Sequence, residues 1–103
     1  MRVVIVEDET AAAVNLASLL RQTFPHMEVV AQLESVTDTV EWFSENEAPA
    51  LVFMDIHLAD GSAFSVFERT EIASPVIFTT AYDQYALEAF RVNSIDYLLK
   101  PIK

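Results

Sequence analysis

The sequence predicts an α/β fold built on a doubly wound, five-stranded parallel sheet. Five short apolar runs alternate with longer stretches in which apolar residues recur every three or four positions. Continuous apolar runs of this length are typical of parallel strands that helices cover on both faces. Four of the runs end at a polar residue, and parallel strands bring such residues to one edge of a sheet. The runs lie at residues 3–6, 29–33, 51–54, 76–79 and 95–99.

The first predicted unit is a strand over about residues 2–6 followed by a helix over about residues 10–23. Thr10 is the predicted N-cap of this helix, because a hydroxyl there can accept from an N–H group of the first turn. Pro25 should end the helix, since a proline disfavours helical geometry in the residue before it. The apolar stripe of the helix consists of Ala13, Leu16, Ala17, Leu20 and Phe24.

The second unit is a strand over about residues 29–33 and a helix over about residues 36–46. Its helix carries apolar residues on one side and acids on the other, so we expect it to cover the sheet with the apolar side. Pro49 precedes the third strand. The apolar side consists of Val36, Val40 and Phe43.

In the second half, Asp60-Gly61 predicts a turn into a helix over about residues 62–70. Pro75 opens the fourth strand, and a short helix over about residues 85–92 leads to the fifth strand over about residues 95–99. Right-handed crossovers are expected throughout. A further helix is expected after Lys103, so the chain is interpreted as a shortened segment. Ala63, Phe64 and Phe67 should form the inner face of the third helix.

Size and charge exclude several classes of protein. A chain of 103 residues supports one domain, and its net charge of −10 argues against direct binding to a nucleic-acid backbone. No apolar stretch approaches the about 20 residues of a membrane span, and the start does not resemble a signal peptide. Without cysteine, neither a disulfide framework nor a thiolate metal site is available. A cytoplasmic location is the simplest interpretation.

Three acidic residues are predicted to meet at the strand edge: Glu7, Asp8 and Asp55. Carboxylates a few ångströms apart repel one another unless a cation neutralises them, and Mg²⁺ is the ion that uses one or two carboxylates together with phosphate oxygens. The alternative is a solvated acidic turn, Glu7-Asp8-Glu9, at a helix start that favours acids. Asp55 favours the metal site, because a carboxylate that ends a buried strand needs a partner.

Thr80 and Lys100 follow the fourth and fifth strands and are candidates for the same site. We prefer Thr80 to Thr79, because side chains alternate along a strand and the small Ala81 leaves space beside Thr80. Lys100 is either an end-of-strand residue whose ammonium extends into solvent or a bridge to Asp55 and a phosphoryl oxygen.

These residues resemble the receiver domain of two-component response regulators. The resemblance extends over the whole chain, and residues 79–102 are most like receivers attached to LytTR-type DNA-binding domains. It rests on four motifs, Val4-Ile5-Val6-Glu7-Asp8-Glu9, Phe53-Met54-Asp55, Thr80-Ala81 and Tyr97-Leu98-Leu99-Lys100-Pro101.

The resemblance implies a flavodoxin-like sheet with strand order 2-1-3-4-5, and it makes residues 1–103 a C-terminally truncated receiver without its output domain. It also implies a phosphorylation-dependent signalling switch that regulates transcription. Asp55 would accept a phosphoryl group from a sensor histidine kinase in the presence of Mg²⁺, and the receiver would control an attached LytTR-type output domain. The receiver would catalyse only its own phosphoryl transfer and dephosphorylation.

The resemblance also implies residue roles. Asp8 would bind Mg²⁺ directly, Glu7 mainly through water and His57 through its backbone carbonyl, and Asp55 would be a further metal ligand. The loop from Asp55 to Gly61 departs from the family pattern, because it lacks a proline and is short. The roles at the other strand ends are phosphoryl contact by Thr80 and Lys100, aromatic switching by Tyr97, and a fixed turn at Pro101.

The resemblance implies partners as well: the kinase, a second copy bound through the fourth helix and fifth strand, and DNA only through the output domain; no membrane is involved. Two alternatives compete with this interpretation. A phosphatase with an aspartyl-phosphate intermediate would carry a second carboxylate two residues after Asp55, where this chain has His57. A receiver-like module that signals by binding alone, without phosphorylation, is the other.

Overall fold

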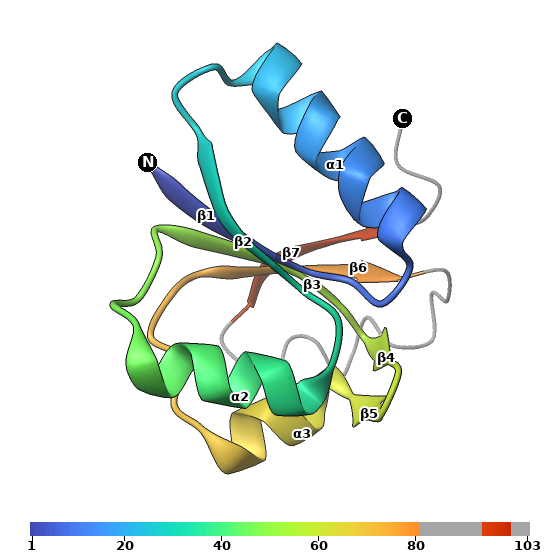
Figure 1. Ribbon diagram of the computed structural model, residues 1–103, viewed down its shortest axis with the longest axis vertical. Coiled ribbons are helices and arrows are strands. Elements are labelled where there is room, and N and C mark those ends of the chain that lie inside the picture. Colours follow the sequence, from blue (N-terminus) through green and yellow to red (C-terminus); the bar gives the residue numbers. More distant parts are fainter. Residues whose placement is uncertain (81–93, 100–103) are drawn as a thin grey trace.

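A five-stranded parallel sheet forms the centre of the molecule (Figure 1). The computed structural model describes residues 1–80 and 94–99, with the side chains of residues 1–79. The strand order is β2-β1-β3-β6-β7, and each neighbouring pair is parallel. This is the predicted order 2-1-3-4-5 once the five sheet strands are counted along the chain. The strands are β1 (Arg2–Val6), β2 (Glu28–Leu33), β3 (Leu51–Asp55), β6 (Val76–Thr80) and β7 (Ser94–Leu99).

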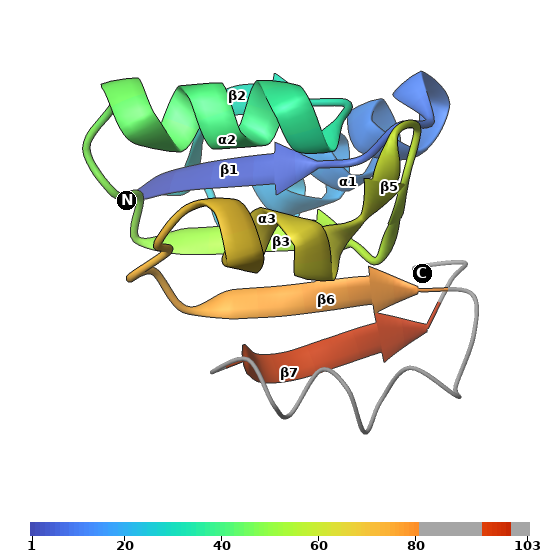
Figure 2. The ribbon, with the colours of Figure 1, turned by 90° about the horizontal axis from the view of Figure 1, so that it is seen from below.

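Helices cover both faces of this sheet, as the apolar runs predicted. One face carries α1 (Thr10–Thr23), and the opposite face carries α2 (Val36–Glu45) and α3 (Ala63–Arg69) (Figures 1 and 2). Each helix begins within a residue of the predicted position. The predicted helix over about residues 85–92 lies outside the described residues. Within the described part of the chain, no helix is long and apolar enough to cross a membrane.

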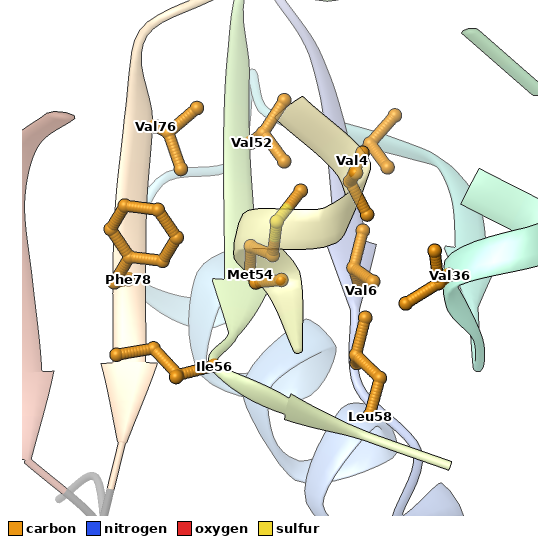
Figure 3. Close-up of a cluster of buried hydrophobic side chains, with 11 residues drawn as sticks. Val4, Val6, Val36, Val52, Met54, Ile56, Leu58, Val76 and Phe78 are labelled. Atoms are coloured by element: carbon orange, nitrogen blue, oxygen red, sulfur yellow. The ribbon is translucent and has the colours of Figure 1, made fainter. Parts of the chain in front are cut away.

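The alternation of side chains along the strands divides the core into two clusters. Val3 and Ile5 of β1 face α1, whereas Val4 and Val6 face α2 and α3 (Figure 3). The cluster that faces α2 and α3 includes Phe78, which is fully buried. Its ring lies 5.6 Å from the ring of Phe64 and 5.9 Å from that of Phe67, centroid to centroid. The two phenylalanines predicted for the inner face of α3 therefore do pack against the sheet.

Two local predictions for α1 are wrong. Thr10 is the first helical residue and not the N-cap, because Glu9 is the last residue with an extended backbone (φ −86°, ψ 111°). The Thr10 hydroxyl instead donates to the Glu34 carboxylate over 3.4 Å. Phe24 does not extend the apolar stripe, because its backbone has left helical geometry (φ −131°, ψ 81°) and its side chain is 45% exposed.

A small antiparallel hairpin follows β3 and was not predicted. It consists of β4 (His57–Leu58) and β5 (Gly61–Ser62), with His57 paired with Ser62 and Leu58 with Gly61. The turn of this hairpin is Ala59-Asp60, so the turn predicted at Asp60-Gly61 is placed one residue too late, because Gly61 already belongs to β5. Ser62 then caps α3, because its hydroxyl accepts from the Phe64 N–H over 3.1 Å.

Candidate functional site

Two neighbouring strands bring the acidic residues to the same edge. β1 ends at Val6, which is paired with Met54 of β3. The residue after each of these two is an acid, Glu7 after Val6 and Asp55 after Met54, so the two acids lie side by side at the strand ends. Figure 2 shows the carboxyl ends of β1, β6 and β7 at one side of the molecule, together with β5 of the hairpin. In an open parallel sheet this is the edge at which ligands bind.

The three predicted carboxylates do converge. Glu7, Asp8 and Asp55 each offer a carboxylate oxygen that lies within 4.8 Å of the other two. Glu7 is only 5% exposed and Asp55 only 6%, whereas Asp8 is exposed to solvent. The acidic turn is thus not simply a solvated helix start, because one of its acids is buried beside the acid that ends β3.

Backbone N–H groups hold two of these carboxylates in place. The N–H of Glu9 donates to Oε2 of Glu7, and the N–H of His57 donates to Oδ1 of Asp55, each over 3.2 Å. In both cases the donor lies two residues after the acid, which is the arrangement of a local side-chain turn. These bonds orient the buried carboxylates and offset part of their mutual repulsion.

The donor set fits a hard divalent cation. All three side chains offer carboxylate oxygens, the ligands that Mg²⁺ and Ca²⁺ prefer, and none offers sulfur or nitrogen. Two of the three close carboxylates are largely removed from water, where repulsion between charges is weakly screened, and this favours a bound cation over the bare cluster. The cluster can therefore hold a metal ion, as the sequence predicted.

His57 lies at the start of the hairpin with its side chain exposed to solvent. The structure describes its N–H as a donor to Asp55. Two backbone bonds fix the adjacent segment: the Ile56 N–H donates to the Thr79 carbonyl over 3.2 Å, and the Ala63 N–H donates to the Ile56 carbonyl over 2.8 Å. The backbone around His57 is thus held next to Asp55, and its carbonyl stays a predicted metal ligand.

The remaining predicted site residues lie at the ends of β6 and β7. Asp55 is paired with Thr79 across the β3–β6 boundary, and Thr80 ends β6 and is paired with Leu99. The Thr79 side chain is 3% exposed, but the side chain of Thr80 is not among those described. The choice of Thr80 over Thr79 therefore stays a prediction.

Three further assignments concern β7 and the residues after it. Tyr97 lies in β7, paired with Phe78, and its side chain is not described. Lys100 and Pro101 lie outside the described residues. The roles assigned to these three residues stay predictions.

One residue near the site was read only as part of a turn. Asp60, at the tip of the hairpin, accepts from the Val36 N–H through Oδ1 (2.6 Å) and from the Thr37 N–H and hydroxyl through Oδ2 (3.1 and 3.0 Å). The Val36 N–H contributes most to holding the pKa of Asp60 below its usual value of 3.8. No local sequence signal marks this cap, because the acid lies more than 20 residues after the helix start that it caps.

Comparison with known proteins identifies the family of the chain. The family model described as the response regulator receiver domain matches residues 3–103. The chain belongs to this family. The receiver is 43% identical over its whole length to the sensory transduction protein LytT of Enterococcus faecalis. It is 33% identical over 98% of its length to the transcriptional regulatory protein LytR of Staphylococcus aureus.

A solved structure supports the same assignment. The response regulatory domain of mrkE from Klebsiella pneumoniae matches all of this chain and 85% of its own, with a TM-score of 0.85 and 30% identity. The receiver spans 43% of the length of the E. faecalis protein and 42% of that of the S. aureus protein. The chain is thus a LytT/LytR-like receiver domain of a two-component response regulator.

Proposed function

We propose that this receiver is a phosphorylation-dependent switch in which Asp55 accepts a phosphoryl group from a sensor histidine kinase with Mg²⁺ as cofactor. The observation that carries the proposal is the convergence of the Glu7, Asp8 and Asp55 carboxylates within 4.8 Å at the carboxyl edge of the sheet. Asp55 is the acceptor because it ends the central strand β3, with Asp8 and Glu7 beside it to hold the cation.

The chemistry needs positioning and charge neutralisation more than any further functional group. An Asp55 carboxylate oxygen attacks phosphorus in line, a new O–P bond forms, and the donor's bond to phosphorus breaks with its electron pair leaving on the donor. The His57 N–H holds the Asp55 carboxylate in one orientation during this step. Mg²⁺, held by Asp8, Asp55, the His57 carbonyl and Glu7 through water, would neutralise charge on the phosphoryl oxygens.

The product places close to two negative charges at an already acidic edge. We assign Thr80 and Lys100 to the new phosphoryl oxygens, Tyr97 to the aromatic switch and Pro101 to the turn after the lysine. Shifting a two-state equilibrium from mostly inactive to mostly active needs about 5.5 kcal/mol of differential stabilisation. Two or three charge-assisted hydrogen bonds, at about 1.5–3 kcal/mol each, supply that amount.

The rest of the proposal concerns partners. One similar protein is described as a transcriptional regulator and another as a sensory transduction protein. By analogy, we assign an attached LytTR-type output domain that contacts DNA, a histidine kinase as phosphoryl donor and a cytoplasmic location. The receiver acts as a phosphoacceptor and not as an enzyme on a separate substrate. Pairing of two receivers through the fourth helix and β7 belongs to the same proposal.

The decisive experiment is the intact mass of the chain after incubation with acetyl phosphate and Mg²⁺. We expect a gain of one phosphoryl group, which is lost in Asp55→Asn and when EDTA removes the metal. Asp38→Asn, which removes the same charge from an exposed position on α2, should be labelled like the wild type. Absence of labelling in a folded wild-type chain would contradict the proposal and favour a module that signals by binding alone.

A further inference from the structure

The β4–β5 hairpin connects the acidic cluster to helix α2. It begins two residues after Asp55, and its tip residue Asp60 contacts the first turn of α2. These two regions are distant in sequence, since Asp60 and Val36 are separated by 24 positions. The hairpin is therefore attached to the site at one end and to the start of α2 at the other.

Both oxygens of Asp60 are engaged by α2. Oδ1 accepts from the Val36 N–H, and Oδ2 accepts from the N–H and the hydroxyl of Thr37. Ser35 completes the cap, because its hydroxyl accepts from the Asp38 N–H over 3.0 Å and its carbonyl accepts from the Thr39 N–H over 3.1 Å. The N–H groups of the first turn, which have no partner within the helix, are thus satisfied from two different segments.

Packing reinforces the contact. Leu58 of β4 is buried in the same cluster as Val36 of α2, and Figure 3 shows their side chains near Val6. Gly61, next to Asp60, has φ +153°, a conformation that other residues rarely adopt. A Cβ on Gly61 would meet a Val36 methyl at 3.6 Å, an ordinary contact, so backbone conformation and not space requires glycine there.

We propose that Asp60 is a positioning residue of the receiver: by anchoring the hairpin tip on α2, it holds the backbone of residues 56–58 against the acidic cluster and so sets the cluster's affinity for a divalent cation. This inference rests on the proposed function for the identity of the site. Asp60 itself is not among the clustered carboxylates, and its oxygens bind α2. Its effect on the site therefore passes through the hairpin.

The test compares three variants of the full chain. Asp60→Ala removes the anchor, whereas Asp60→Asn keeps one of the two acceptor oxygens at the same place, and asparagine caps helices well. Ser35→Ala is the matched control, because it removes a cap from the same helix end without touching the hairpin. Comparable losses of melting temperature in Asp60→Ala and Ser35→Ala would show that α2 is disturbed similarly in both.

The first readout is hydrogen exchange of the Ile56, His57 and Leu58 amides without metal. Asp60→Ala should raise their exchange rates, whereas Ser35→Ala and Asp60→Asn should leave them near wild type. This readout does not depend on phosphorylation, so it remains informative if the proposed function fails.

The second readout is a Mg²⁺ titration followed by amide chemical shifts. Asp60→Ala should bind Mg²⁺ about tenfold more weakly, as is typical when a group that orients metal ligands is removed. Saturating Mg²⁺ should then restore its rate of labelling by acetyl phosphate, and Asp60→Asn should stay close to wild type. Equal amide exchange and equal Mg²⁺ affinity in Asp60→Ala and Ser35→Ala would overturn the inference, leaving Asp60 as a cap alone.

Discussion

Helices α1 and α2 begin at the same edge of the sheet, but they differ in the side chains that cap the N–H groups of their first turns. α1 starts after Glu9, which makes no side-chain cap, although three consecutive acids precede the helix. α2 starts with two capping side chains, Ser35 from its own sequence and Asp60 from the hairpin beyond β3. The residue at the N-cap position of α1 is thus an acid whose side chain does not cap the helix.

The difference shows that the surrounding donors decide what a carboxylate does. Glu7 accepts from the N–H of Glu9, a residue before the helix, so its carboxylate remains beside Asp8 and Asp55. Asp60 accepts three hydrogen bonds from α2, so its carboxylate serves the fold. The proposed metal site needs closely spaced acids at one strand edge, and a Glu9 side chain that does not cap α1 is compatible with that need.

The largest expected effect is the stabilisation of the fold by Mg²⁺, which should depend on an acid beside the start of α1 and not on an acid at the start of α2. Mg²⁺ at about 100 times its dissociation constant should raise the free energy of unfolding by about 2.7 kcal/mol, because a ligand that binds only the folded state stabilises it. Asp8→Ala should abolish this gain, while Asp38→Ala in the first turn of α2 should keep it. Urea unfolding with and without Mg²⁺ measures the difference, and a gain that survives in Asp8→Ala would contradict the metal assignment.

A second prediction removes the local cap of α2. Ser35→Ala should lower the free energy of unfolding by about 1 kcal/mol, since the Asp38 N–H loses its acceptor. Ser44→Ala is the control at the other end of the helix, where the hydroxyl only donates to the Glu41 carbonyl of its own helix. It should change stability by less than about 0.5 kcal/mol. Equal effects of the two substitutions would show that the cap does not stabilise α2.

A third prediction gives α1 the cap that it lacks. Glu9→Ser should raise the free energy of unfolding by about 0.5–1 kcal/mol, because the backbone of residue 9 is extended and a hydroxyl there can reach an N–H group of the first turn. Glu9→Ala removes the same charge without adding an acceptor, so it separates capping from charge. If both variants gained equally in chemical denaturation, reduced repulsion and not the cap would explain the result.

Most of the fold follows from the sequence because it depends on periodic burial. The apolar runs that became β1, β3 and β6 are buried along most of their length, and helix stripes such as Ala13 to Leu20 face the sheet. The meeting of Glu7, Asp8 and Asp55 follows from the same pattern, since parallel neighbouring strands end at one edge. Sequence alone therefore predicted this acidic cluster.

The features that were missed depend on single backbone angles or on contacts between distant segments. Thr10 was assigned as a cap one residue late, because the sequence does not show that Glu9 is the last extended residue. The hairpin was missed because its two strands have two residues each, too short for a periodic signal. Asp60 was missed as a cap because its partner helix lies earlier in the chain.

The smallest expected effect concerns the pH dependence of the Asp60 cap. Its hydrogen bonds with Val36 and Thr37 lower the pKa of Asp60 below 3.8, so the ionised cap stabilises the fold above that pH and the contribution is lost as pH falls through the lowered pKa. Asp60→Asn lacks this contribution at every pH. The melting temperature of the wild type should therefore exceed that of Asp60→Asn at neutral pH, and the difference should shrink below pH 3.8.

Ser35→Ala removes a cap that does not titrate, so the difference in melting temperature between this variant and the wild type should stay constant over the same pH range. A wild-type advantage over Asp60→Asn that persists at the lowest pH would mean that the geometry of the carboxyl group, and not its charge, stabilises the start of α2.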